Sequence, residues 1–306
     1  MSIPAFADIA KPSNDLLSRD FYHTASANLE VKSKAPNGVA FTVKGKSDHK
    51  AGAIAGQIEA KYTDKPTGVT LTQAWTTANA LDTKVELDNT LAKGLKAEVI
   101  TNFFPSSKSK GAKLNLHYRQ PLFHARAFFD LLKGPSFNGD VVLGHDGFLA
   151  GAEVGYDVVN GRITRYSAAV GYSVPEYTAA ITATNNLNVF AASYYHKVNA
   201  QVEAGAKATW DAKSGNAGGV GLEIASKYKL DSAAFVKAKI NNQGIAALAY
   251  NQLLRPGVTL GLGASVDTQR LNESAAAHKN FRYHGEVRIR EYIDTHGVPK
   301  LAFVEY

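Results

Sequence analysis

From Asn28 to about Asp267, apolar and polar residues alternate with a period of two in a nearly unbroken series of short segments. Successive side chains of a β-strand point to opposite faces, so each segment predicts a strand with one apolar and one polar face. Clear examples lie at residues 38–46, 54–62, 81–88, 112–119, 201–210 and 258–266. In the first example, the apolar and polar sets are Val39, Phe41 and Val43 against Thr42, Lys44 and Lys46.

Turn residues separate these segments. Four dipeptides have the composition of two-residue hairpin turns, in which both central positions need positive φ: Asn37-Gly38, Asn138-Gly139, Asp146-Gly147 and Asn160-Gly161. Residues 66–68 and 256–257 supply Pro and Gly to two further connections. Short hairpins in series predict an up-and-down meander, which has to close on itself to avoid exposed edges.

The spacing of the segments favours a membrane-spanning barrel. Each strand with its turn takes about 14 residues, and a tilted transmembrane strand needs about 9 to 11 of them. The strands of soluble β-sandwiches are shorter, at about 5 to 6 residues. We therefore predict an all-β fold, namely a transmembrane β-barrel of about 19 strands.

The distribution of charge supports the same orientation. Lys, Arg, Asp and Glu occur on the polar faces along the whole chain, as expected for side chains around a water-filled lumen. The opposing faces are almost free of charge, and Gln73, between Leu71 and Trp75, is a visible polar exception. A large soluble β protein also has alternating strands, so periodicity alone leaves that alternative open.

Residues 4–21 follow a different pattern. The apolar residues recur at roughly helical spacing, at Phe6, Ile9, Leu16, Leu17 and Phe21. Because Pro12 disfavours helical geometry at Lys11, we predict a short turn, a break and a helix that starts near Pro12. Asp15 and Arg19 are expected to share that helix, whereas Asp8 would extend the charged row only on an unbroken one. Periodicity leaves two placements open: on a membrane surface, or inside the lumen.

Composition narrows the classes of function. The chain of 306 residues has a formal net charge of +7 and no cysteine, which excludes disulfides and thiolate metal sites. No secretory signal and no apolar run of about 18 to 20 residues is visible. The lysines are spread singly, so nucleic acid is not an expected partner. No phosphate loop, metal spacing or nucleophile–base pair occurs, so we predict no enzyme activity and no cofactor.

Ordered sequence blocks then point to a family. They begin with PAFADIAK, NDLL and DFY, and continue through Gly94-Leu95-Lys96 with the preceding Leu91-Ala92. Later blocks are AFFDLLKGPS, GHDGFLAGAEVGYDV, SAAVGY, AAITATNNL, ASYYHKVN, KYKLD and RPGVTLGLGASVDTQRL. Up to about Ala277, the chain resembles a fungal mitochondrial porin, the voltage-dependent anion channel of the outer membrane.

The resemblance implies a 19-stranded barrel with its N-terminal helix in the pore. It implies a voltage-gated, weakly anion-selective passage for ATP, ADP, phosphate and other small metabolites through the lipid bilayer of the mitochondrial outer membrane. Whether the chain forms a homo-oligomer there stays open. An import barrel of the same fold is an alternative function, but it would favour an acidic and apolar lumen. A soluble β binding protein is a second alternative.

Individual residues carry over from the resemblance. It links Lys11 and Arg19 to nucleotide contact and gating, and it makes Gly94, Leu95 and Lys96 a signature that starts a strand. Residues 245–247 and 263–267 match positions linked to NADH contact in animal relatives. Gln73 stands where animal relatives often carry a membrane-facing Glu, so behaviour that depends on that carboxylate is expected to be absent.

The polar faces supply the charge of the predicted pore. The basic residues in that phase are Lys44, Lys46, Lys61, Lys84, Lys96, Lys113, Arg119, Arg126, Lys207, Lys227, Lys237 and Lys239. They are diluted by acidic residues such as Glu59, Asp82, Glu86, Glu98 and Glu203. Selectivity in a wide pore follows the charge that lines it, so this mixture predicts a weak preference for anions.

The predicted organisation has three parts: an N-terminal amphipathic helix segment at residues 1–24, a barrel at 25–293, and a divergent C-terminal appendage at 294–306. After Ala277 the sequence departs from the family pattern. Alternation nevertheless continues from Phe281 to Arg290, with Tyr283, Val287 and Ile289 in the apolar phase. Residues 280–293 are therefore expected to form an atypical closing strand.

Overall fold

The computed structural model describes residues 2–21, 27–48, 53–132, 136–214, 219–255, 258–269, 282–290, 292–293 and 299–300. A 3₁₀ turn η1 (Phe6–Asp8) and a helix α1 (Lys11–Ser18) precede the strands, and a second 3₁₀ turn η3 (Ala212–Ser214) follows β14. None of the helices among these residues has the length and apolar character needed to cross a membrane.

Nineteen strands form one sheet. Their bounds are β1 (Ala27–Lys34), β2 (Ala40–Asp48), β3 (Ala53–Asp64), β4 (Val69–Thr76), β5 (Leu81–Asp88), β6 (Leu95–Phe104), β7 (Ser109–Arg119), β8 (Phe123–Asp130), β9 (Ser136–His145), β10 (Phe148–Asp157), β11 (Arg162–Ser173), β12 (Tyr177–Thr184), β13 (Val189–Lys197), β14 (Val202–Asp211), β15 (Val220–Lys229), β16 (Ala234–Asn241), β17 (Ile245–Arg255), β18 (Val258–Asp267) and β19 (Arg282–Arg290).

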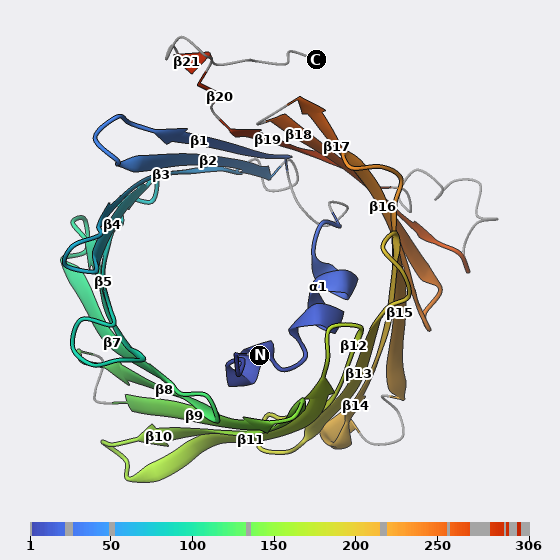
Figure 1. Cartoon of the computed structure of the whole chain (residues 1–306), viewed down its shortest axis with the longest axis horizontal. Helices are drawn as coiled ribbons and strands as arrows, with labels where there is room; N and C mark the ends of the chain where they lie inside the picture. The colour runs from blue at the N-terminus through green and yellow to red at the C-terminus, as the bar shows by residue number, and fades with distance from the viewer. Residues whose placement is uncertain are drawn as a thin grey trace.

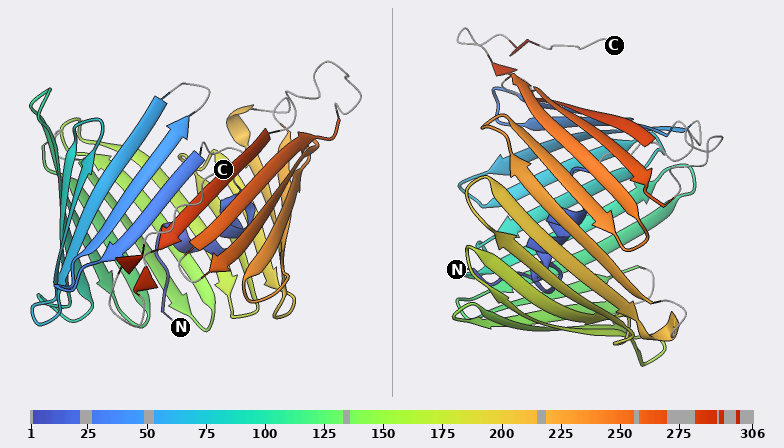
Figure 2. Two further views of the ribbon diagram at one scale, coloured as in Figure 1. Left: turned by 90° about the horizontal axis from the view of Figure 1, so that it is seen from above. Right: turned by 90° about the vertical axis from the view of Figure 1, so that its right-hand side faces the viewer.

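The sheet closes into a barrel because β1 is paired on both edges. Each strand pairs in antiparallel fashion with the next in sequence, whereas β19 also runs parallel to β1, with Leu29 opposite Val287. Figure 1 shows the resulting ring in cross-section, and Figure 2 shows its strands inclined to the barrel axis. Closure leaves no unpaired edge in the ring. The prediction of an all-β barrel with about 19 strands is confirmed.

The alternation of the sequence becomes an apolar outer wall. Side chains such as Ile58, Val170, Ile181 and Leu248, at 52%, 55%, 57% and 56% exposure, point away from the lumen on three different parts of the ring. Gln73 also faces outward, between Leu71 and Trp75. A soluble protein rarely exposes an apolar surface of this extent. The wall therefore disfavours the soluble alternative.

Aromatic side chains gather near both ends of the strands on this outer wall. Near one rim lie Trp75, Phe103, Phe190 and Trp210, with the last two rings stacked at a centroid distance of 5.6 Å. Near the other rim lie Tyr62, Tyr118, Phe148, Tyr172 and Tyr177, among which the Phe148 and Tyr172 centroids are 4.7 Å apart. Two aromatic girdles around an apolar band are the pattern of a barrel in a bilayer.

The hairpin dipeptides divide into confirmed and wrong predictions. Asp146 and Gly147 both have positive φ, at 48° and 87°, whereas in the Asn37 and Asn160 turns only the glycine does. The prediction for Asn138-Gly139 is wrong, because both residues lie inside β9. There they pair with β8 and β10, and ladder pairing on both sides outweighs the local turn preference of the dipeptide. The Pro256-Gly257 connection lies outside the described residues.

The last two short strands are separate from the barrel. β20 (Tyr292–Ile293) pairs with β21 (Pro299–Lys300) in a two-stranded sheet. Figure 1 shows this small sheet outside the ring, beyond the end of β19.

Candidate functional site

The N-terminal segment lies inside the ring, against one side of its inner wall (Figure 1). In η1 and the turn after it, Phe6 and Ile9 pack on Val142, Leu149 and other wall residues of β9–β12. In α1, the buried Leu16 and Leu17 pack on Ala225 of β15 and Tyr195 of β13. Farther along, Phe21 packs on two alanines of β17. Of the two placements that periodicity left open, the lumen is the observed one.

Small wall residues allow this close approach. Gly151 lies under both Phe6 and Ile9, and a Cβ at that position would come within 3.0 and 3.1 Å of their side chains. Gly205 of β14 lies under Leu16, where a Cβ would meet the Leu16 Cδ2 atom at 2.9 Å. Larger residues at these sites would push the segment off the wall.

The helix begins and ends close to the predicted positions. α1 starts at Lys11 with Pro12 in its first turn, after a break that separates it from η1. It ends at Ser18, because Arg19 has extended backbone angles and Asp20 has a φ of 62°. Arg19 is thus the C-terminal cap and lies just outside the helix, contrary to the expectation that it shares the helix with Asp15. Their side chains still approach to 3.9 Å.

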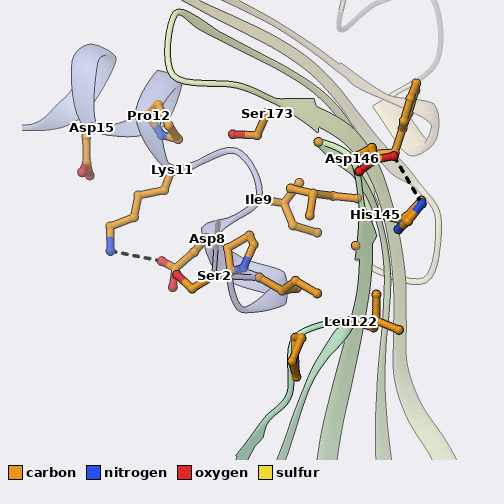
Figure 3. A pocket seen from close by; sticks show the side chains of 17 residues that line it. Ser2, Asp8, Ile9, Lys11, Pro12, Asp15, Leu122, His145, Asp146 and Ser173 are labelled. Atoms are coloured by element: carbon orange, nitrogen blue, oxygen red, sulfur yellow. Dashed lines mark ion pairs between the residues drawn. The ribbon is translucent and has the colours of Figure 1, made fainter.

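An ion pair also bridges the break. The Lys11 Nζ lies 3.2 Å from Asp8, although the sequence analysis required an unbroken helix for this contact. The 3₁₀ turn brings Asp8 back toward Lys11 without helical continuity. Figure 3 shows the two side chains pointing toward one another beside a cavity of about 700 Å³. The N-terminal segment and the β9–β10 hairpin line this cavity. Lys11 and Arg19 both remain largely exposed, at 56% and 63% of their side chains.

Polar contacts fasten the helix to the wall. Lys207 of β14 donates from Nζ to the Asn14 side-chain oxygen at 3.0 Å. Lys237 of β16 donates to the backbone oxygens of Asp15 and Arg19 at 3.0 and 2.6 Å. Lys239 donates to the backbone oxygen of Leu17 at 3.0 Å. These contacts identify the face of β14 and β16 that points inward.

The ladder register places the predicted pore lysines and arginines on that same inner face. Directly paired residues of an antiparallel sheet share a face, and the phase can be followed from Lys207 around to β2. The basic residues placed there are Lys44, Lys46, Lys61, Lys84, Lys96, Lys113, Arg119, Arg126, Lys207, Lys227, Lys237 and Lys239. The structure gives their positions, and their role in selectivity stays a prediction.

On the wall opposite the helix, some of these charges are neutralised. Lys96 lies 2.6 Å from Glu86 and 2.8 Å from Glu98, and Lys84 lies 3.1 and 3.4 Å from the same two carboxylates. The four groups form a square across β5 and β6. Arg126 of β8 makes a forked contact with Asp140 of β9, with N–O distances of 2.9 to 3.1 Å.

Other inner cations have no such partner. Among the described residues, no carboxylate lies within 4.0 Å of the charged groups of Lys44, Lys46, Lys61, Lys113 or Arg119. Arg119 donates from Nε to His124 at 3.4 Å. A cavity of about 520 Å³ runs along β3–β8 and is lined by Lys84 and Lys113 together with Glu59 and Asp82. Of the unpartnered cations, Lys113 therefore faces space that an ion can occupy.

The Gly94-Leu95-Lys96 segment lies where β6 begins, and Gly94 and Lys96 each make specific contacts there. Gly94 has a φ of +84°, and a Cβ there would come within 2.3 Å of the Arg119 backbone oxygen. Its own oxygen accepts from the Arg119 N–H at 2.8 Å, which joins the start of β6 to the end of β7. Leu95 is the first residue of β6, and Lys96 belongs to the charged square.

The residues matched to NADH contact lie side by side on the wall. The register pairs Ile245 with Asp267 and Ala247 with Ser265. However, Phe21 covers Ala247, which is only 2% exposed. In this arrangement, the N-terminal segment occupies the inner surface at that position.

The structural use of Lys237 and Lys239 differs from the prediction. That prediction placed both among the pore charges, whereas their ammonium groups are bound to helix carbonyls. A signal was present, because Lys237 lies directly opposite Lys227 and like charges in that position destabilise a sheet unless something compensates them. The register was needed to recognise this pairing.

Comparison with known proteins gives consistent results. The model of the eukaryotic porin family matches residues 2–279. The chain is similar to the "Mitochondrial outer membrane protein porin" of Neurospora crassa, with 63% identity over 91% of this chain and 97% of the relative. A protein of the same description from Candida albicans is 53% identical over 89% and 95% of the two chains. The "Non-selective voltage-gated ion channel 1" of Saccharomyces cerevisiae is 44% identical, with the same coverage.

Proposed function

Since the chain belongs to the eukaryotic porin family, we propose that it forms a voltage-gated pore for ions and small metabolites in the mitochondrial outer membrane. The observation that carries this proposal is a closed barrel with an apolar outer wall, charged residues on its inner face and a helix lying against that inner face. Strands that alternate in this way satisfy every backbone group within the bilayer and leave a polar path through it.

The permeating molecules are proposed to be ATP, ADP, phosphate and other small anions, with cations passing less readily. Support comes from the inner lysines and arginine that have no carboxylate partner among the described residues, namely Lys44, Lys46, Lys61, Lys113 and Arg119. The square of Lys84, Lys96, Glu86 and Glu98 adds no net charge, and neither does the Arg126–Asp140 pair. Such partial compensation suits a weak anion preference and not an exclusive filter.

Lys11 and Arg19 are proposed to contact passing nucleotides and to take part in gating. Both side chains are largely exposed in the lumen, and each is only loosely tied to one aspartate of its own segment. A solvent-exposed ion pair contributes little free energy, so the basic side chain can leave its aspartate and bind a phosphate group instead.

We propose the same three-part organisation that the sequence predicts, with residues 1–24, 25–293 and 294–306 as helix segment, barrel and appendage. The register supports the closing role of residues 280–293, since β19 pairs with both β18 and β1. The separate sheet of β20 and β21 supports an appendage outside the ring. Assembly into a homo-oligomer within the bilayer is also proposed, with the apolar outer wall as the contact surface.

Reconstitution tests the function directly. Purified protein in a planar bilayer should give large conductance steps that close partly at higher voltage. In a potassium chloride gradient, the reversal potential should show chloride passing more readily than potassium. A protein that gives no steps after confirmed insertion would refute the pore, and a preference for potassium would refute the proposed selectivity alone.

A further inference from the structure

Lys237 is a buried cation with an unusual partner. It is only 2% exposed, and lysine is almost never buried this completely unless it is paired. In the part of the chain that the structure describes, no carboxylate oxygen comes within 4.0 Å of its ammonium group. Its donors go instead to the backbone oxygens of Asp15 and Arg19. The partner of this lysine is the C-terminal end of a helix.

The electrostatics of that end suit a cation. The end of a helix carries a partial negative charge of about half a unit, because most of its last carbonyl groups have no intrahelical partner. The Asp15 oxygen also accepts from the Arg19 N–H, at 3.0 Å. Lys239 binds a further carbonyl, that of Leu17, at 3.0 Å. The ring of Phe21 lies under both ammonium groups, with its centroid 5.0 Å from Lys237 and 4.9 Å from Lys239. Two lysines and one ring therefore converge on the point where α1 ends.

β15 and β17, the strands on either side of β16, leave room for the contact between Lys237 and the end of α1. On one side, Lys227 of β15 lies directly opposite Lys237, but it approaches Glu203 to 3.8 Å and the Phe235 ring to 4.7 Å. On the other side, β17 presents Ala247 and Ala249, which are small enough to receive Phe21. The wall thus offers two cations and a shallow apolar surface at the point where the segment leaves the helix, and no carboxylate oxygen of the described wall residues lies within 4.0 Å of the Lys237 ammonium group.

We infer that Lys237, assisted by Lys239, is a positioning residue that holds the C-terminal end of α1 against β16 and so fixes the width of the pore beside the helix. The inference rests on the proposed pore function. It deepens that function because these two lysines no longer act as free anion-attracting charges. The helix end offsets part of their charge, and in return they keep the helix on the wall.

Two matched substitutions test the role. K237M keeps an unbranched side chain of similar length and removes all donors. K227M removes the same charge at the directly opposite position, where the lysine does not touch the helix. The chain has no cysteine, so a single cysteine at the exposed Ser18 can carry a spin label that reports on the helix end in every variant.

In liposomes, the label should be immobilised in the unsubstituted chain and in K227M. The mobile fraction should rise about ten-fold or more in K237M, since a hydrogen bond to a charged group is worth about one such factor or more. K237R retains donors and should restore most of the immobilisation. In planar bilayers, the open channel of K237M should show several conductance levels where the unsubstituted chain shows one. K227M should keep one conductance level and change only the reversal potential.

The outcomes separate the inference from the pore function. Label mobility and open levels in K237M that match those of K227M would overturn the positioning role, even if both variants conduct. An unsubstituted chain that inserts without conducting would refute the pore, while the label would still report whether Lys237 holds the helix. If K237M fails to insert, K239M removes one helix contact, and an unchanged label in that variant would overturn the inference.

Discussion

Reversal of the unpaired lysines on β2 and β3 should invert the selectivity of the pore. Lys44, Lys46 and Lys61 lie on the inner face of two adjacent strands. Among the residues that the structure describes, no carboxylate lies within 4.0 Å of their ammonium groups. Replacing all three with Glu changes the charge by two units at each position and lowers the formal net charge from +7 to +1. The change is concentrated on one side of the lumen, where only β4 separates these strands from the charged square on β5 and β6.

The size of the effect follows from the Coulomb interaction with a passing ion. At about 10 Å in water, one ammonium acts on a monovalent ion with about 0.4 kcal/mol, and screening at 0.1 M salt reduces this to about 0.15 kcal/mol. Replacing a positive with a negative charge changes this interaction energy by twice its size, about 0.3 kcal/mol. Potassium and chloride respond with opposite sign, so the difference between their energies in the pore changes by about 0.6 kcal/mol per lysine. Three reversals should therefore move the ratio by about ten-fold or more.

The reversal potential in a potassium chloride gradient measures this ratio. A first control is the pair K96Q and E98Q, which removes one charge of each sign from the square and should leave the ratio nearly unchanged. A second control reverses Lys65, Lys93 and Lys108, which lie in turns at the rims, with the same net change of six charges. At 1 M salt the Debye length is only about 3 Å, so all shifts should shrink. An unchanged ratio in the β2–β3 variant, or an equal shift in the rim variant, would refute the lumen assignment.

Three further substitutions probe the barrel itself. G94A should lower the free energy of unfolding in detergent by about 2 kcal/mol or more, because it places a Cβ against the Arg119 oxygen at positive φ; a denaturant midpoint equal to that of the parent would contradict this reading. R126L should cost on the order of 3 kcal/mol by leaving the buried Asp140 unpaired, and R126L with D140L should recover most of the loss in the same measurement. Deletion of everything after Ala277 removes β19 and exposes the edges of β1 and β18, so conductance steps should vanish; normal steps would show that the closing strand is dispensable.

Much of the fold was predictable because the signal was local. A period of two over segments such as residues 38–46 and 201–210 fixes which side chains share a face, and the number of segments fixes the strand count. Pro12 marked the break before α1 for the same reason, since its effect on the backbone depends on its neighbours alone. Predictions of this kind do not depend on contacts between residues that are far apart in the sequence.

The errors arose where long-range contacts decide. Asn138-Gly139 has the local preference of a turn, yet two neighbouring strands hold it in β9. The Asp8–Lys11 pair forms across a broken helix because the turn geometry of η1 brings the two residues together. The partner of Lys237 could not be predicted either, since a carbonyl at the end of α1 is separated from it by 218 to 222 positions in sequence.

The helix contacts only part of the charged inner wall, and this uneven arrangement would account for the proposed preference for anions in a barrel lined by both signs. On the side of β14–β16, Lys207, Lys237 and Lys239 bind the polar groups of α1, so their positive charge is largely used to hold it. On β5, β6 and β8, Lys84, Lys96 and Arg126 are balanced by carboxylates. Among the described residues, uncompensated cations remain on β2, β3 and β7. The preferred path of an anion should therefore run along the wall that the helix leaves free, and a displaced helix would expose new cations on the wall it abandons.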